Sequence, residues 1–188
     1  MTPQIRKQKV LRSVDSTVPA RMRRRALRVT RRFGESPQRV FGAWLDPDLA
    51  GQWLFATALR PMTHVAIDAR VGGAFCFADR RNGERIEFTG EYTEIIPQRR
   101  LVFNLTAAND PRVVTRVIVE ITARKSGCEI ELIQEEVPPD DPNYTRERWL
   151  GILYGLGVAL DSTATTSSDR KSRAAMTRTS GQGKNRDQ

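Results

Sequence analysis

The feature that most constrains the fold of this chain is a run of strand-like segments between residues 64 and 136, interrupted only by turn residues. Apolar and polar residues alternate within the segments, as they do in half-buried strands. Gly72-Gly73 and Asn82-Gly83, two dipeptides that favour tight hairpin turns, join the first three segments. The segments cover residues 64–71, 74–78, 85–95, 101–106, 113–123 and 128–136. Because consecutive strands joined by short turns pair antiparallel, the run predicts a six-stranded meander.

Helical signals lie only on either side of this run. Before it, a short strand-like segment over residues 26–33 leads to Ser36-Pro37, which is the start signal of a helix of about nine residues. Asp46-Pro47 then begins a second short helix over residues 48–55. The order predicts an α+β helix-grip architecture: a curved antiparallel sheet of about seven strands holds one long C-terminal helix.

The long helix begins at Asp141-Pro142, and we expect it to end at about Leu160. Its apolar stripe has helical spacing and consists of Trp149, Leu153, Leu156 and Leu160. Three glycines interrupt it, at 151, 155 and 157, and each costs about 1 kcal/mol relative to alanine. Two explanations stay open: the glycines allow close packing on the sheet, or they leave room for a ligand beneath the helix.

The net charge of +9 would suggest a nucleic-acid partner if it lay in the folded part of the chain. Residues 1–32 contribute +10 and residues 162–188 contribute +4, which leaves −5 for residues 33–161. The patterned part of the chain is therefore mildly acidic. We expect the basic charge to make at most weak, non-specific contacts with anions, through the two ends alone.

Neither end of the chain shows hydrophobic periodicity. Residues 1–25 are basic with scattered apolar residues, and residues 162–188 are rich in Ser, Thr and Arg. Segments of such composition cannot bury enough apolar surface to fold independently. We therefore expect a disordered basic tail over residues 1–25, one domain over residues 26–161, and a second disordered tail over residues 162–188.

Several protein classes are excluded by the composition. The longest uncharged apolar run, Leu150 to Leu160, has 11 residues, whereas a spanning helix needs roughly 18. Cys76 and Cys128 are too few for a disulfide framework or a cysteine zinc site. The N-terminal region has no apolar core of a secretory signal. We expect a cytoplasmic protein, monomeric or homodimeric, that does not span a membrane.

Groups suited to catalysis are scarce. His64 is the only histidine, which excludes a metal site or an acid–base pair built on two histidines. Glu129 and Glu131 alternate with apolar neighbours, so we expect them on the solvent face of a strand. Cys76 lies between two phenylalanines and faces away from both, which favours an inert thiol over a nucleophile. The sequence therefore predicts no catalytic residue, metal or cofactor.

Four motifs follow one another in a characteristic order. They are residues 39–47 (RVFGAWLDP), 67–75 (IDARVGGAF), 90–95 (GEYTEI) followed by 100–103 (RLVF), and Trp149 followed by 151–153 (GIL). In this order they resemble the START/Bet v1-like superfamily, and within it the branch similar to the C-terminal domain of the activator of Hsp90 ATPase. The resemblance covers about residues 26–161.

This resemblance implies a fold and a cavity rather than a reaction. Members of the branch have a helix-grip fold with a cavity between the sheet and the long helix. The resemblance implies no common set of catalytic residues that could be transferred to this chain. The chain departs from the family pattern at Val71, where members often have proline, and at Tyr154, where a charged or polar residue is common.

Aromatic residues are the candidates to line such a cavity. Alternation directs the strand aromatics toward one face of the sheet, opposite the apolar stripe of the helix. The candidate ligand-binding residues are Trp44, Trp53, Phe75, Phe77, Phe88, Tyr92, Phe103, Asn104, Trp149, Leu153 and Leu156. Tyr92, Asn104 and Gln134 would supply hydrogen bonds. The alternative is that the aromatics fill a solid core.

Three functions compete at this point. The first is a protein that binds a small hydrophobic or amphipathic molecule in the cavity and has no chemistry of its own. The second is an enzyme similar to the polyketide cyclases and dehydratases of the superfamily, with Tyr92 as the ionisable group of its pocket. The third is a module that interacts with Hsp90, as the family resemblance implies.

Overall fold

The computed structural model describes residues 26–56, 60–106, 113–135 and 142–179. Its elements are β1 (Leu27–Phe33), α1 (Pro37–Leu45), α2 (Pro47–Trp53), β2 (His64–Ile67), β3 (Ala74–Arg81), β4 (Glu84–Ile96), β5 (Arg100–Thr106), β6 (Val114–Ala123), β7 (Cys128–Gln134) and α3 (Pro142–Thr179). The predicted order of strand, two short helices, six-stranded meander and long C-terminal helix is confirmed.

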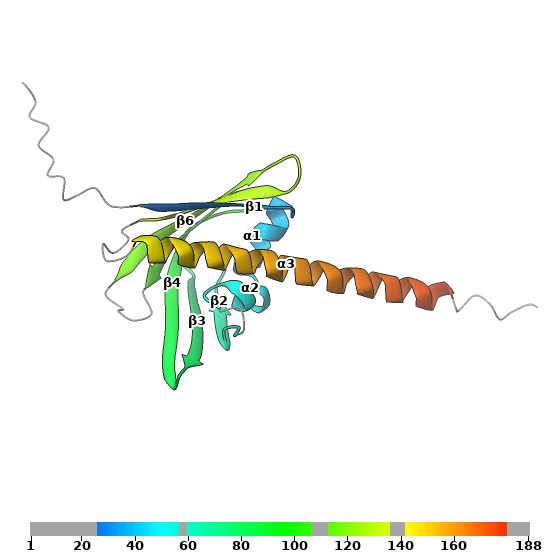
Figure 1. Cartoon of the computed structure of the whole chain (residues 1–188), viewed down its shortest axis with the longest axis horizontal. Coiled ribbons are helices and arrows are strands. Elements are labelled where there is room, and N and C mark those ends of the chain that lie inside the picture. Colours follow the sequence, from blue (N-terminus) through cyan, green and yellow to red (C-terminus); the bar gives the residue numbers. More distant parts are fainter. Residues whose placement is uncertain (1–25, 57–59, 107–112, 136–141, 180–188) are drawn as a thin grey trace, which may run out of the picture.

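The seven strands form one antiparallel sheet. Its order is β1-β7-β6-β5-β4-β3-β2, so the meander runs from β2 to β7 and β1 pairs with the last strand. α3 packs against β1 and α2 and lies across one face of the sheet, with its far end extending past the sheet (Figure 1). This is the expected α+β helix-grip arrangement.

One aspartate links the two short helices. The backbone N–H of Asp46 donates to the carbonyl of Gly42 at the end of α1. The carboxylate of Asp46 accepts from the N–H groups of Asp48 and Leu49, at 2.9 and 3.2 Å, and so caps α2. Since one residue closes α1 and opens α2, the helices turn sharply and both place a tryptophan inside the fold.

The ends of α2, β2 and β3 differ from the sequence prediction. α2 ends at Trp53 rather than at residue 55 because Phe55 has a left-handed backbone, with φ of 60°. β2 ends at Ile67, since residues 68–73 fold into a turn closed by the N–H of Gly73 on the carbonyl of Arg70. β3 extends to Arg81, and the Asn82-Gly83 turn then joins it to β4, with positive φ at both residues as predicted for this hairpin.

The expected end of the long helix at about Leu160 is wrong. α3 continues to Thr179, so residues 162–179, which we expected to be disordered, are helical. This stretch contains neither glycine nor proline, and nothing in its sequence stops a helix that has already been nucleated. Amphipathic periodicity could not reveal it, because the helix there runs beyond the sheet (Figure 1).

Two of the three helix glycines are explained by close packing. A Cβ on Gly155 would lie 3.4 Å from the Cβ of Trp53, so α2 and α3 approach closely there. A Cβ on Gly157 would lie 3.4 Å from a guanidinium nitrogen of Arg31. Gly151 faces open space. The packing explanation thus holds for Gly155 and Gly157, whereas neither explanation accounts for Gly151.

Candidate functional site

A continuous network of aromatic rings lies between the sheet and α3. The rings contact one another at centroid distances of 4.4 to 6.3 Å. In order of contact they are Trp53, Trp44, Phe103, Tyr92, Phe75, Phe77 and Phe55, and the ring of Phe55 contacts both Phe88 and Trp149. The network joins α1 and α2 to the first turns of α3, and its rings occupy the space in which a helix-grip protein would hold a ligand.

Ten of the eleven candidate residues lie in this interior. All ten are buried: Trp44, Trp53, Phe75, Phe77, Phe88, Tyr92, Phe103, Trp149, Leu153 and Leu156. The eleventh, Asn104, lies on the opposite face of the sheet, because it follows the inward-facing Phe103 on β5.

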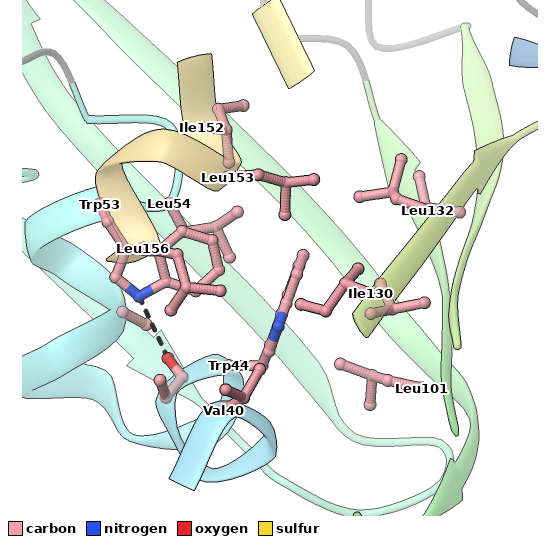
Figure 2. Close-up of a cluster of buried hydrophobic side chains, with 14 of the residues drawn as sticks. Val40, Trp44, Trp53, Leu54, Leu101, Ile130, Leu132, Ile152, Leu153 and Leu156 are labelled. Atoms are coloured by element: carbon pink, nitrogen blue, oxygen red, sulfur yellow. Dashed lines mark hydrogen bonds between the residues drawn. The ribbon is translucent and has the colours of Figure 1, made fainter. Parts of the chain in front are cut away.

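Trp44 stands at the centre of one half of the interior. Its ring lies between Leu101 and Ile130 of the sheet and Leu153 of α3 (Figure 2). The Nε1–H of Trp44 is buried and has no hydrogen-bond partner among the described residues. An unsatisfied buried donor costs about 1–3 kcal/mol, so this N–H is a free position for an acceptor inside an otherwise apolar site.

The other two tryptophans differ from Trp44 in this respect. Trp53 Nε1 donates to the carbonyl of Ala43 at 3.2 Å (Figure 2). Trp149 Nε1 donates to Oε1 of Gln134 at 2.6 Å, and Nε2 of Gln134 donates to Oγ1 of Thr115 at 3.1 Å. Gln134, expected to offer a hydrogen bond to a ligand, is therefore engaged in a buried network that anchors the start of α3 to the sheet.

Tyr92 is a poor candidate for acid–base work at neutral pH. Its side chain is buried, and burial raises the pKa of its hydroxyl well above the ordinary value. The group therefore stays a neutral phenol, which can donate a hydrogen bond but does not remove a proton.

Phe55 is the one ring of this network that is absent from the residues predicted from the sequence. It is buried, although it follows α2 in a left-handed conformation that costs a bulky residue about 1–2 kcal/mol. Its ring stacks on Phe88 at 4.4 Å and an interplanar angle of 14°, and meets Phe77 edge-on at 5.5 Å. Packing of the ring thus offsets a strained backbone.

An arginine of β3 holds the backbone of Phe55 in place. Arg81 Nη2 donates to the carbonyl oxygen of Phe55 at 3.0 Å. Arg81 Nε lies 3.3 Å from Oδ2 of Asp79, whose side chain is almost fully buried, and Thr63 Oγ1 lies 3.3 Å from Oδ1 of Asp79. Sequence alternation could have identified Asp79 and Arg81, because residues two and four positions after the inward-facing Phe77 point to the same face of the strand.

The charge of Asp79 makes stability depend on pH. Burial alone would raise its pKa, but hydrogen bonds from the Arg80 backbone, Arg81 and Thr63, with the charge of Arg60, outweigh it and hold the pKa below its ordinary value. A lowered carboxyl pKa stabilises the fold above the unfolded-state pKa, and this contribution disappears as the pH falls through the folded-state pKa.

We therefore expect Asp79→Asn to flatten the acid limb of the stability curve. Urea unfolding between pH 3 and 7 measures this. The wild type should lose stability toward pH 3 more steeply than Asp79→Asn, and Asp48→Asn, at an exposed site, should retain the wild-type slope. Equal slopes for wild type and Asp79→Asn would contradict the assignment.

The opposite face of the sheet carries an open groove of about 770 Å³. Small side chains of β2 to β5 form its floor, among them Ala66, Cys76 and Thr89, and Asn104 lies at one side. Burial and the charge of Glu87 raise the pKa of Cys76, which agrees with the expected inert thiol.

The two glutamates of β7 lie on the face of the sheet that the alternation predicted. His64 is exposed on β2. Glu129 forms ion pairs with Arg32 and Arg124, and Glu131 with Arg28, on the face of the sheet away from α3. Among the described residues, no helix is long and apolar enough to cross a membrane.

Comparison with known proteins agrees with this geometry. Residues 35–161 match the family model described as activator of Hsp90 ATPase homolog 1-like protein. The chain belongs to this family. The AHSA1-like fold is shared by ligand-binding and co-chaperone-like modules of the START/Bet v1-like superfamily, and the resemblance seen in the sequence is thus confirmed.

Solved structures resemble this AHSA1-like domain over nearly their whole length. A protein from Chromobacterium violaceum is 25% identical, with a TM-score of 0.61, and the match covers 71% of this chain and 95% of that one. An AHSA1-like protein from Aeromonas hydrophila is 22% identical, with a TM-score of 0.65 and coverage of 74% and 94%. A Rhizobium leguminosarum protein is 19% identical, with a TM-score of 0.63 and coverage of 73% and 95%. A comparison with curated proteins gives no significant match.

Proposed function

We propose that this AHSA1-like protein binds a small, largely hydrophobic molecule between the sheet and α3. The single observation that carries the proposal is the unsatisfied Nε1–H of Trp44 in the middle of an aromatic interior. Apolar sites with a few fixed polar groups are typical of proteins that hold a ligand by shape and orient it with one hydrogen bond. The ligand class is therefore a hydrophobic molecule with one oxygen acceptor.

The energetics favour a ligand with an acceptor over a pure hydrocarbon. A ligand oxygen on Trp44 Nε1 would recover part of the cost of the unsatisfied donor, about 1–3 kcal/mol. The aromatic rings already pack against one another, so a ligand has to displace at least one side chain on entry. That requirement predicts modest affinity, because ligand binding must offset the cost of opening the interior.

A thermal-shift series tests this proposal. The full chain is heated with decanoate, 2-naphthol or flavone, which represent lipids, phenolics and aromatic polyketides. A ligand at 100 times its Kd stabilises by about 2.7 kcal/mol, which for a chain of this size raises Tm by about 5–10 °C. Trp44→Phe removes the N–H and should weaken binding about five- to tenfold, which gives a smaller rise at the same concentration.

Phe41→Leu is the matched control, because Phe41 is buried on α1 but lies outside the ring network. Its Tm increment with the same probe should equal that of the wild type. The proposal fails if no probe raises Tm, or if Trp44→Phe and the wild type respond equally.

A second candidate function, docking to a protein partner, is favoured by one surface feature. Leu150, Tyr154 and Val158 are 40%, 61% and 49% exposed and recur every four residues along α3. They form a largely exposed apolar line along α3, in which the ring of Tyr154 also contacts β1 through the guanidinium of Arg31, 5.1 Å from the ring centroid. The family description names an activator of Hsp90 ATPase. Binding of a purified Hsp90 to the wild type but not to Tyr154→Glu would favour this candidate.

A further inference from the structure

The interior holds one aromatic ring whose backbone is strained. Phe55 is the only buried aromatic among the described residues that has a positive φ, at 60°. Its ring lies among Phe88, Phe77 and Trp149, at centroid distances of 4.4, 5.5 and 6.3 Å. Strained residues persist where the surrounding structure holds them, and they recur at ligand clamps and switch regions. Release of Phe55 would relieve the strain and open a ring-sized space.

Phe55 offers two groups to its surroundings, a ring and a carbonyl oxygen. The ring stacks on Phe88, and the carbonyl oxygen accepts from Arg81 Nη2 at 3.0 Å. A molecule that takes this place must therefore supply a planar ring and, two saturated carbons away, an acceptor for a guanidinium. An aromatic acid with a two-carbon chain, such as 3-phenylpropionate, has the same connectivity as phenylalanine from its ring to its carbonyl carbon.

The charges around the carbonyl oxygen of Phe55 favour an anionic acceptor at this position over a neutral one. Arg148 of α3 stacks on Phe88, with its guanidinium carbon 4.9 Å from the ring centroid. The two guanidinium groups therefore meet the same pair of stacked rings, Arg81 at the carbonyl of Phe55 and Arg148 at the ring of Phe88. Among the described residues, one carboxylate forms an ion pair with either guanidinium: Asp79 pairs with Arg81.

We propose that Phe55 acts as a resident stand-in for an aromatic carboxylate: such a ligand displaces Phe55, stacks its ring on Phe88 and places its carboxylate on Arg81 and Arg148. This inference rests on the proposed function and assigns the ligand class and the displaced side chain. Arg81 exchanges a carbonyl acceptor for a carboxylate, and charge-assisted hydrogen bonds of this kind are the stronger ones.

Titration calorimetry of the full chain with two probes tests the inference. 3-Phenylpropionate and 3-phenylpropanol have the same ring and chain, but only the first carries a carboxylate. We expect the wild type to bind the carboxylate at least tenfold more tightly than the alcohol. Arg148→Gln, at an exposed position of α3, should reduce that preference at least threefold. Equal affinity of the wild type for the two probes, or an unchanged preference in Arg148→Gln, would overturn the inference.

Phe55→Gly provides the second test. Glycine accepts the positive φ without strain and leaves the ring-sized space open. We expect this variant to bind 3-phenylpropionate at least tenfold more tightly than the wild type, because no ring has to be displaced. Phe41→Ala also removes a buried phenyl ring and should gain no such affinity. A Phe55→Gly protein that binds no more tightly than Phe41→Ala would overturn the inference.

The two proposals can fail separately. If decanoate, 2-naphthol or flavone raises Tm in a manner that depends on Trp44, while 3-phenylpropionate shows no carboxylate preference, the interior binds ligands without the exchange at Phe55. If none of the five probes binds, both proposals fail.

Discussion

Gly90→Ala is expected to lower the free energy of unfolding by about 3–5 kcal/mol. A Cβ at this position of β4 would lie 2.1 Å from the carbonyl oxygen of Asn104 and 2.4 Å from Cζ of Phe75. The first contact is with backbone of the neighbouring strand, so no side-chain rotation relieves it. The second is with a ring of the aromatic network. Urea denaturation of the variant, monitored by far-ultraviolet circular dichroism, measures the loss.

Gly42→Ala is the matched control. Gly42 is an exposed position within α1 where a Cβ would meet nothing within 4 Å, and alanine there should raise stability by about 0.5–1 kcal/mol. Gly90→Ala combined with Phe75→Leu should not recover the wild-type stability, because the clash with Asn104 remains. A Gly90→Ala protein within 1 kcal/mol of the wild type would show that β4 and β5 are not packed as described.

Trp149→Ala is expected to cost about 3–5 kcal/mol. The ring is 3% exposed, contacts Phe55, and donates its N–H to Gln134. Trp149→Phe retains most of the apolar volume but leaves Oε1 of Gln134 without its donor, so we expect a loss of about 1–3 kcal/mol. Denaturant unfolding of both variants gives the two values.

A double-mutant cycle separates volume from hydrogen bonding at this site. Gln134→Leu removes the acceptor, and the double variant Trp149→Phe/Gln134→Leu removes both partners of the bond. Its loss should be smaller than the sum of the two single losses, because no buried group of this pair is left unsatisfied. Losses that add fully would mean that the bond between Trp149 and Gln134 does not contribute to stability.

Most of the fold could be predicted from local patterns. Alternation and turn dipeptides located the strands, and the Asn82-Gly83 hairpin formed where its backbone preferences require. The same alternation placed the five strand aromatics in one interior, and helical spacing placed the five buried candidates of the helices there. The choice of Asn104 as a residue of the interior was wrong. The periodicity that directs Phe103 inward directs Asn104 outward, so the sequence alone could have excluded it.

The strained and engaged groups of the site could not be predicted in this way. The left-handed backbone of Phe55 results from long-range contacts, namely stacking on Phe88 and the hydrogen bond from Arg81, and the sequence around residue 55 carries no turn signal. The free N–H of Trp44 likewise depends on which acceptors surround it in three dimensions. Local sequence determines where an indole lies along a helix but not whether its N–H finds a partner.

The most direct test of a ligand site at Trp44 is the indole ¹⁵N–¹H spectrum of the full chain, recorded with and without the best thermal-shift probe. The three tryptophans supply three signals, and each assignment follows from a Trp→Phe variant. A hydrogen bond shifts an N–H proton downfield, so the account predicts that the signal of Trp44 moves downfield on binding. Those of Trp53 and Trp149, already bonded to Ala43 and Gln134, should keep hydrogen-bonded shifts. A bound ligand that leaves the Trp44 signal in place would contradict the account.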